Sequence, residues 1–246
     1  MKNILVTGIS SGIGFSVADQ LLASGVSVIG LDRSFSENIT HLQQTYPEAL
    51  TFHLCDLLDV DTLPSLIRTL VANHGPLGGL VHCAGYDKMM PLHLAKATDI
   101  ENLWRIHALA PMVLIASLSK RNHYQDQCSI VLISSQSAHE GAMGHTAYAS
   151  AKGAVEGYLA PAAAELMQKG IRLNVVCFAP IRTPMASAWL DKLSDEAMKK
   201  LLESYPLGLG EVSDASNLIC FLLSEKSRFI NGQIITADGG HSVRKI

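Results

Sequence analysis

The chain has 246 residues, of which 48% are hydrophobic and 17% are charged, and its formal net charge at pH 7 is -3. That length and apolar content suffice for one large hydrophobic core, and the lack of a Lys/Arg run in the sequence disfavours nucleic acid as a partner. The longest apolar runs of the sequence fall far short of a membrane span, so no membrane association is expected.

The first residues, MKNILVTG, pass from one lysine directly into an apolar run and a glycine-rich turn. No small-residue cleavage site follows, so we interpret this segment as the first strand rather than as an export signal. The five cysteines lie in or beside apolar runs without CxxC pairs or metal-like spacing, which predicts reduced, mostly buried thiols, no metal site and a cytoplasmic protein. These cysteines are Cys55, Cys83, Cys128, Cys177 and Cys220.

Short β-rich runs alternate with amphipathic stretches of helical length. In chain order the runs are NILVTG, SVIGLD, LTFHLCD, GLVHCAG, SIVLISS, IRLNVVCFA and QIITADGG. The helical stretches cover roughly 12–24, 59–74, 99–121, 146–169 and 211–224, with a weaker one near 36–46. This alternation predicts βαβ units and a parallel sheet with helices on both faces, within a single α/β domain over 1–246. A helical segment at about 183–206, between two prolines, interrupts the rhythm and is predicted to be a flap rather than a second domain.

The turn VTGISSGIG follows the first strand and opens the first helix. Gly8, Gly12 and Gly14 stand where backbone must turn sharply or pass close to another group, and a helix N-terminus suits a pyrophosphate. Because no G-K-[ST] follows, a nucleoside-triphosphate loop is disfavoured. The turn therefore favours a dinucleotide site, and a plain strand-to-helix turn is the alternative.

Asp32 closes the second strand, where a carboxylate can bond both hydroxyls of an adenosine ribose and repel a 2′-phosphate. Ser11, before Gly12, adds no positive charge, so NAD is favoured over NADP, although Arg33 could grip a phosphate or stack on adenine. Asp56, after the third strand, is placed either to reach the adenine amino group or to cap a helix.

Tyr148 and Lys152 stand four residues apart in HTAYASAKGAV and are predicted to share one face of a helix. A nearby ammonium favours phenolate, so we expect a lowered pKa for the Tyr148 phenol, which could then exchange a proton with a substrate oxygen. The residues around Tyr148 and Lys152 are small, which leaves room for a flat cofactor ring beside the helix. Upstream, the strand SIVLISS ends in Ser134 and Ser135 at the sheet edge where ligands bind, and Ser135 could hold the substrate oxygen.

In these motifs the chain resembles the short-chain dehydrogenase/reductase (SDR) family of the classical type, over essentially its whole length. The resemblance rests on TGxxxGxG at Thr7–Gly14, Ala84–Gly85, the Ser135, Tyr148 and Lys152 set, Asn174, Thr183 and the terminal FINGQIITADGG. It implies a doubly wound Rossmann-type domain with a seven-stranded parallel sheet in the order 3-2-1-4-5-6-7 and a small helical substrate flap.

The resemblance also implies roles for individual residues. Tyr148 would be the general acid/base of hydride transfer, Lys152 would orient the cofactor by its nicotinamide ribose, and Ser135 would polarise the substrate oxygen. The expected cofactor contacts are Gly8, Ser10, Ser11, Gly12, Ile13, Gly14, Asp32, Arg33, Asp56, Leu57, Cys83, Ala84, Gly85, Tyr148, Lys152, Ile181 and Thr183.

The sequence departs from the family pattern at three places. His82 and Cys83 replace the two amides of the usual Asn-Asn-Ala-Gly, and FAP at 178–180 replaces the usual Pro-Gly. His107 replaces the usual asparagine of the fourth helix, which supports a bent backbone and a water leading to the lysine. A neutral imidazole can bond a carbonyl or water, so His107 is either a fourth catalytic residue in the proton relay or a histidine packed between helices.

The residues around the expected catalytic pair predict a mostly apolar substrate pocket. Its candidates are Tyr86, Met89, Met90, Met143, His145, Met185, Trp189 and Leu190, with Arg182 and Lys88 as candidate anchors for an anionic group. This lining favours a small substrate or one with an apolar body, although methionine walls are often plain packing.

We therefore expect an NAD(P)-dependent oxidoreductase that interconverts a secondary alcohol and a ketone. Within the class, a 3-oxoacyl-thioester reductase and a cyclic-diol (dihydrodiol-type) dehydrogenase are the alternatives, the former disfavoured by Asp32. From another class, a dinucleotide-binding sensor or scaffold is left open by His82 and His107 and opposed by the intact Ser135, Tyr148 and Lys152. By resemblance alone, the fourth and fifth long helices and GQIITADGG would form the contacts of a homotetramer or homodimer.

Overall fold

A computed structural model describes residues 2–243 of the chain, which form a seven-stranded sheet in the order β3-β2-β1-β4-β5-β6-β7. Each strand pairs in parallel with its neighbours, so all carboxyl ends lie at one edge. The strands are β1 (Asn3–Thr7), β2 (Ser27–Asp32), β3 (Leu50–Leu54), β4 (Leu77–His82), β5 (Tyr124–Ser135), β6 (Arg172–Phe178) and β7 (Ile234–Ala237). The predicted fold class and strand order are confirmed.

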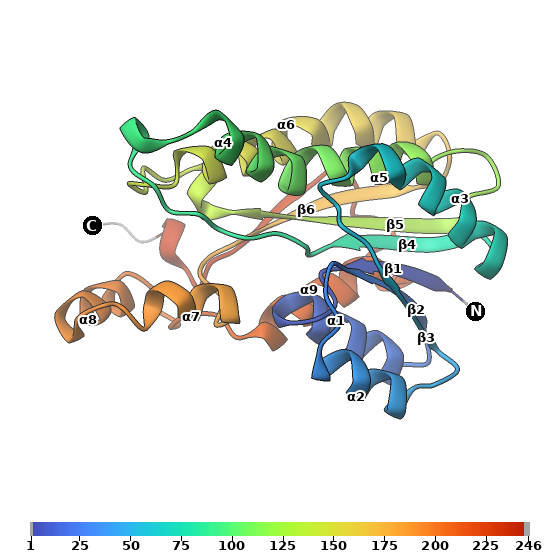
Figure 1. The fold of residues 1–246 in the computed structure, drawn as a ribbon, viewed down its shortest axis with the longest axis horizontal. Coiled ribbons are helices and arrows are strands. Elements are labelled where there is room, and N and C mark those ends of the chain that lie inside the picture. Colours follow the sequence, from blue (N-terminus) through green and yellow to red (C-terminus); the bar gives the residue numbers. More distant parts are fainter. Residues whose placement is uncertain (1, 244–246) are drawn as a thin grey trace.

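Helices cover both faces of this sheet (Figure 1). On one face lie α3 (Leu63–His74), α4 (Ala97–Trp104), α5 (Ala110–Leu118) and α6 (Thr146–Met167). On the other lie α1 (Gly12–Ala23), α2 (Glu37–Thr45) and α9 (Val212–Leu223). Two remaining helices, α7 (Pro184–Leu190) and α8 (Asp195–Glu203), project beyond the sheet.

Two hydrophobic clusters, one on each face, share the strands between them. Alternate side chains of β1 point to opposite faces: Leu5 packs under α3 and α5, whereas Ile4 and Val6 pack against α1 and α9. Burial of both faces explains why the strands read as continuously apolar sequence.

Several elements differ in their bounds from the sequence prediction. α3 begins at Leu63, four residues after the predicted start at 59, behind a 3-10 turn at Val60–Thr62. β5 begins at Tyr124, five residues before the predicted run, because Tyr124 pairs with Leu77 of β4 across a register irregularity. The predicted helix over 99–121 is divided into α4 and α5 by a π-helical turn at Arg105–Leu109. This turn is the bent backbone expected around His107, and the histidine lies within it.

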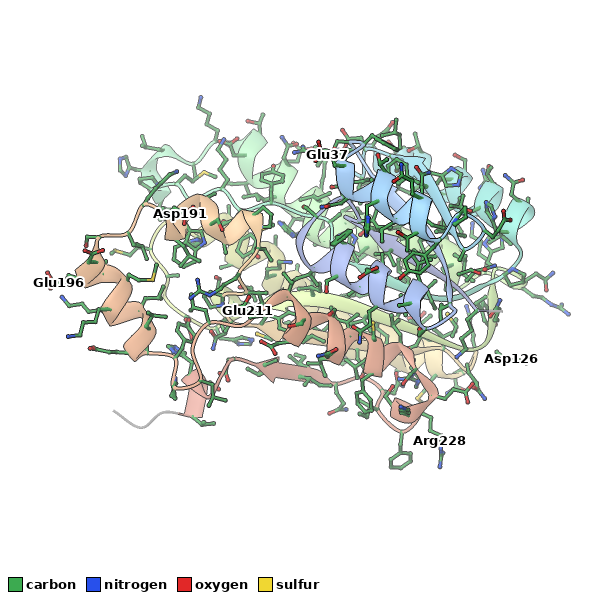
Figure 2. The ribbon with its side chains drawn as sticks, turned by 90° about the horizontal axis from the view of Figure 1, so that it is seen from below. Glu37, Asp126, Asp191, Glu196, Glu211 and Arg228 are labelled. Carbon is green, nitrogen blue, oxygen red and sulfur yellow. The ribbon has the colours of Figure 1, made fainter. Side chains whose placement is uncertain are left out.

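The segment predicted as a flap folds into α7 and α8. Each helix has a hydroxyl at its N-terminus: the Thr183 Oγ1 accepts from the Ala186 N–H at 3.2 Å, and the Ser194 Oγ accepts from the Ala197 N–H at 3.3 Å. A small cluster of its own, including Leu190 and Tyr205, holds the pair together. In Figure 2, Asp191 and Glu196 mark this part, away from the sheet.

Within residues 2–243, no helix combines the length and the apolar character that crossing a membrane requires.

Candidate active site

One cleft of about 940 Å³ opens at the carboxyl ends of the strands. It runs from the turn after β1, past the ends of β2, β4 and β5, to the start of α6 and to α7. Every residue that the sequence predicts for catalysis or cofactor contact lines this cleft, including His107, Arg33, Leu57 and Cys83. The structure therefore brings the whole predicted set into one place.

The glycine-rich turn is built from close backbone contacts. Gly8 has a φ of +72°, and a Cβ there would lie 2.7 Å from the backbone nitrogen of Ala84. A Cβ on Gly14 would meet the Gly8 carbonyl, so α1 can approach the turn only without a side chain at that position. Ser11 is the N-cap of α1 but its side chain makes no capping hydrogen bond, and Ser11 lines the cleft.

Asp32 stands at the end of β2 with both carboxylate oxygens facing the cleft-side loops. Its Oδ2 accepts from the Ser10 N–H at 3.0 Å, and its Oδ1 accepts from the Ser34 N–H at 3.2 Å. Asp56 accepts a hydrogen bond from the Leu58 N–H at 2.9 Å, which is a local turn contact rather than a helix cap. Both aspartates line the cleft and form hydrogen bonds with the loops at this end of it.

Ser135, Tyr148 and Lys152 meet at the opposite end of the cleft. Ser135 ends β5, and the other two lie on the first turns of α6. The Lys152 Nζ lies 5.5 Å from the Tyr148 ring centroid and donates to the Ile133 carbonyl at 2.8 Å. The Ser135 hydroxyl is within hydrogen-bonding reach of the phenol and also exchanges hydrogen bonds of 3.2 Å with Ser137.

The expected lowering of the tyrosine pKa is wrong for this arrangement. Burial raises the pKa of the Tyr148 phenol above its ordinary value, the Asp87 carboxylate raises it further, and the hydrogen bond from Ser135 lowers it only in part. Burial lowers the pKa of Lys152 to about 8. The reason is that the ammonium is directed at the Ile133 carbonyl, so desolvation of the phenolate outweighs its attraction.

His107 packs edge-on against Tyr148, with ring centroids 5.0 Å apart and the planes at 88°. Its Nε2 lies 2.7 Å from the Tyr86 carbonyl, and burial holds the pKa of the imidazole well below its usual range. The ring is therefore neutral, Nε2 carries the proton and donates to that carbonyl, and Nδ1 is an acceptor. Nδ1 is buried and has no hydrogen-bond partner in the described structure.

His82 takes over the hydrogen bonds of an amide. Its Nε2 donates to the Ile106 carbonyl at 2.8 Å, while its Nδ1 accepts from the Thr7 hydroxyl at 2.9 Å. The same hydroxyl accepts from the Ala84 N–H at 3.2 Å. Burial lowers the pKa of His82 to about 3, so it is a neutral link between β1, β4 and the π-helical turn.

The substrate side of the cleft agrees with the sequence prediction only in part. Tyr86, Met89, His145, Met185 and Trp189 line it. In contrast, Met143 is 92% exposed outside it, and Met90 and Leu190 are buried in packing clusters.

The two predicted cationic anchors also lie elsewhere, because each is engaged with a carboxylate. Lys88 pairs with Asp99 at 2.6 Å, and Arg182 pairs with Glu211 at 3.3 Å. Glu211 marks the start of α9 in Figure 2.

Several polar residues of the cleft were missed by the sequence prediction. They are Asp87, Gln136, Glu140, Lys192 and Tyr205. The Asp87 Oδ2 and the His145 Nε2 lie within hydrogen-bonding distance at 2.9 Å, across 58 residues of sequence. The only sequence signal for Asp87 was its place shortly after Ala84–Gly85, at the carboxyl end of β4.

At the flap side, Ile181 and Thr183 line the cleft together with Phe178 and Ala179. The Thr183 hydroxyl already caps α7, so a ligand carboxamide would share that oxygen. All five cysteines are free thiols. Burial raises the pKa of Cys83 and of Cys177 to about 12, which leaves both thiols protonated at neutral pH.

Comparisons with known proteins match nearly the whole chain. A family model described as enoyl-(acyl carrier protein) reductase matches residues 8–242. The L-xylulose reductase of Caenorhabditis elegans is 31% identical, with 98% of this chain and 96% of the relative covered. Among solved structures, 4-hydroxyisoleucine dehydrogenase complexed with NADH matches with a TM-score of 0.91 at 25% identity, covering 100% of both chains. The structure titled ElxO with NADP bound matches with a TM-score of 0.87 at 30% identity, covering 99% of both chains.

Proposed function

Because the chain belongs to the short-chain dehydrogenase/reductase family, we propose that it is an NAD(P)-dependent oxidoreductase that interconverts a secondary alcohol and a ketone. One observation carries the proposal: Ser135, Tyr148 and Lys152 line the same cleft as the glycine-rich turn. The nicotinamide cofactor, when bound, gives or takes the hydride. The remaining steps are carried out by side chains of this chain.

The residues present fit such a cofactor. The backbone of the glycine turn is packed so closely that side chains at Gly8 and Gly14 would not fit. At the N-terminus of α1, the Ser11 side chain accepts no hydrogen bond from the helix N–H groups. These N–H groups and the helix dipole suit a pyrophosphate. Asp32 would hold the adenosine ribose, Lys152 the nicotinamide ribose, and Thr183 the carboxamide.

The raised pKa of Tyr148 keeps its phenol protonated at neutral pH, which is the form that carbonyl reduction uses. A phenol that stays protonated at neutral pH is a proton donor, and it would give its proton to the substrate oxygen as the carbonyl is reduced. Ser135 would hold that oxygen in place. The Lys152 ammonium, 5.5 Å from the ring centroid, would stabilise the negative charge left on the phenol.

Asp32 supports NAD rather than NADP as the cofactor. Its carboxylate is fixed by two backbone N–H groups at the ribose end of the cleft, and a 2′-phosphate there would meet a negative charge. Arg33 also lines the cleft and would stack on the adenine. A 3-oxoacyl-thioester reductase and a dihydrodiol-type dehydrogenase remain the closest alternative activities.

We further propose that the protein is a cytoplasmic homotetramer or homodimer. Free thiols in all five cysteines suit a reducing compartment. Apolar side chains that lie open on α4, such as Ile100 and Trp104, and Ile234 on the edge strand β7 would be covered by partner subunits.

The proposal is tested by replacing Tyr148 with phenylalanine. NADH binding is followed by fluorescence titration, and turnover is followed with a panel of ketones and diols. We expect Tyr148→Phe to keep NADH affinity near that of the parent while turnover falls by about 100-fold or more, a general-acid contribution. Tyr158→Phe, on the same helix but outside the cleft, is the matched control. NADH binding without turnover of any substrate by the parent would instead favour a dinucleotide sensor.

A further inference from the structure

We propose that His139, Glu156 and Cys177 form a binding site for one zinc-like divalent cation directly behind the catalytic pair. The proposal does not depend on the reaction, because it concerns side chains outside the set that lines the cleft. It also differs from the sequence expectation, which indicated no metal site because the cysteines lack CxxC pairs and metal-like spacing.

The three donor groups converge from three elements. His139 follows β5 at the end of a short 3-10 turn, Glu156 lies on α6, and Cys177 lies on β6. Their donor atoms all lie within 4.8 Å of one another, and the His139 Nε2 is 2.9 Å from a Glu156 carboxylate oxygen. Zinc bonds nitrogen and oxygen at about 2.0 Å and sulfur at about 2.3 Å, so its tetrahedral ligands lie roughly 3.3–3.8 Å apart. The donor atoms would therefore have to draw together by up to about 1 Å or slightly more to reach the spacing of zinc ligands.

The donor set matches zinc in its chemistry as well. One imidazole, one thiolate and one carboxylate are the ligand types that zinc takes in proteins, and three protein ligands leave a fourth position for water. His139 lies on the solvent side with 54% of its side chain exposed, whereas Glu156 is partly buried and Cys177 is buried. Solvent therefore reaches the site from the histidine side.

Glu156 is already held in a fixed orientation. The buried Ser134 hydroxyl donates to its Oε1 at 2.5 Å, and the His139 Nε2 faces the carboxylate at 3.0 Å from Oε1 and 2.9 Å from Oε2. Such outer hydrogen bonds orient metal-binding carboxylates in known sites. Ser134, which directly precedes Ser135, would thereby orient the Glu156 carboxylate towards the metal.

The local charge also favours a cation. The carboxylates of Glu156, Asp238 and Glu140 all act on the Cys177 thiol, and Lys152 is the positive group that opposes them. A bound divalent cation would offset this negative charge. Binding converts the thiol to a thiolate bonded to the metal and releases one proton to solvent, so that charge and atoms balance.

The site adjoins the catalytic residues. Tyr148, Lys152 and Glu156 follow at intervals of four along α6 and thus share one helix face, and the thiol of Cys177 is near enough to act on both Tyr148 and Lys152. A cation bound at this site would repel the Lys152 ammonium electrostatically. We therefore expect micromolar zinc to inhibit turnover.

The test uses chelator-treated full-length protein titrated with cobalt(II) chloride alone. We expect one cobalt per chain and a thiolate-to-cobalt absorption band in the near ultraviolet. Cys177→Ser should abolish the band, and His139→Gln should weaken cobalt affinity at least about tenfold. Cys220→Ser, on α9 across the sheet, is the matched control and should keep both.

A second readout separates this site from the activity. Zinc should inhibit the parent enzyme but inhibit His139→Gln at least about tenfold more weakly, because that half-exposed side chain is outside the cleft. Far-ultraviolet circular dichroism checks that each variant folds. Absence of the band in folded parent protein, or its persistence in Cys177→Ser, would overturn the proposed site. A parent without turnover but with the cobalt band would overturn only the proposed function.

Discussion

The imidazole of His107 occupies space that a side chain at position 85 would need. A Cβ added to Gly85 would overlap the His107 Cε1 and lie 2.7 Å from its Nδ1. The glycine of the Ala84–Gly85 pair is therefore required here by contact with the ring rather than by its backbone conformation. This links the histidine in the π-helical turn to the loop after β4.

A double-mutant cycle tests that contact. Overpacking of a buried site costs about 1–3 kcal/mol, so Gly85→Ala should lower the free energy of unfolding by that amount. In a His107→Asn background the smaller amide leaves room, and the same substitution should cost at least about 1 kcal/mol less. Urea denaturation of the parent, both single variants and the double variant measures the coupling. Additive losses would show that the ring and the glycine do not constrain each other.

Burial of the Lys152 ammonium lowers the stability of the folded protein, and this effect can be measured. Its pKa is about 8 in the folded protein against 10.5 for the free side chain, so below pH 8 the folded state holds a charge in a buried place. The unfolded state binds more protons between these values, and stability therefore rises as the pH rises from 8 to 10.5. The shift corresponds to roughly 3 kcal/mol at neutral pH.

Lys152→Met should relieve this cost. We expect the variant to be more stable than the parent at pH 7 by about 1–3 kcal/mol, since the lost hydrogen bond to the Ile133 carbonyl offsets part of the gain. The difference should shrink as the pH is raised to 10.5. Chemical denaturation at several pH values measures it, and a variant less stable than the parent at every pH would contradict the assigned burial cost.

Asp32 is the residue expected to discriminate between the two cofactors. Asp32→Ala removes the negative charge that a 2′-phosphate would meet, so the ratio of NADPH to NADH affinity should rise by about tenfold, equivalent to roughly 1.4 kcal/mol. The ratio is the proper measure, because the variant also loses the Ser10 contact and both affinities can fall. Fluorescence titration with each cofactor decides, and Asp59→Ala, outside the cleft, is the control.

At the scale of elements, the His82 side chain connects the sheet to the π-helical turn by hydrogen bonds. The imidazole bonds Thr7 of β1 on one side and the Ile106 carbonyl on the other. The bond that Nδ1 accepts from the Thr7 hydroxyl needs the neutral ring, since both ring nitrogens are donors once the imidazole is protonated. The pKa of about 3 in the folded protein lies below the ordinary 6.5, so the unfolded state takes up protons first as the pH falls.

That difference predicts an acid dependence of stability. Stability from this group is present above pH 6.5 and is lost as the pH falls from 6.5 towards 3, by up to about 1.4 kcal/mol per pH unit. His82→Asn, which offers a donor and an acceptor without titrating, should flatten the dependence in that window. His41→Asn, an exposed histidine of α2, should leave it unchanged. Thermal denaturation from pH 7 to pH 4 measures the slopes, and equal slopes for parent and His82→Asn would refute the link.

The elements themselves could be predicted from sequence to the extent that their periodicity was strong. α1, α6 and α9 lie within two residues of the expected bounds, whereas α3 begins at Leu63, four residues after the predicted start, because a 3-10 turn at Val60–Thr62 precedes it. The early start of β5 was missed because Tyr124–Gln127 is polar sequence that pairs only through its neighbour β4. The π-helical turn leaves no mark in periodicity, and only the family resemblance pointed to it.

The residues of the candidate site could likewise be predicted from sequence only where a local pattern fixes their positions. Residues inside local motifs, such as Ser135 and Tyr148, could be predicted because a strand end and one helix turn fix their positions. The hydrogen bond between Asp87 and His145 joins segments 58 residues apart, and no local pattern indicates it. The tyrosine pKa was misjudged for a related reason: burial depends on the assembled cleft, not on spacing along α6.

At the scale of the whole molecule, the two hydrophobic clusters cannot be separated. Leu80 and Val81, consecutive in β4, belong to opposite clusters, so either layer of helices unfolds only if the shared strands lose their packing. The flap is different, because the cluster around Leu190 and Tyr205 is small and lies beyond the sheet. We therefore expect one cooperative domain that carries a less stable flap.

The chain offers two tryptophans that report on these parts separately. Trp104 ends α4, and Trp189 lies on α7 of the flap. In a Trp189→Phe variant, Trp104 fluorescence and far-ultraviolet circular dichroism should follow one urea transition with the same midpoint, because both faces share the sheet. In a Trp104→Phe variant, Trp189 fluorescence should change at the same or lower urea concentration, and added NADH should raise the main midpoint by mass action. A circular dichroism transition in two steps, with Trp104 following only one of them, would mean that the two faces unfold as separate domains.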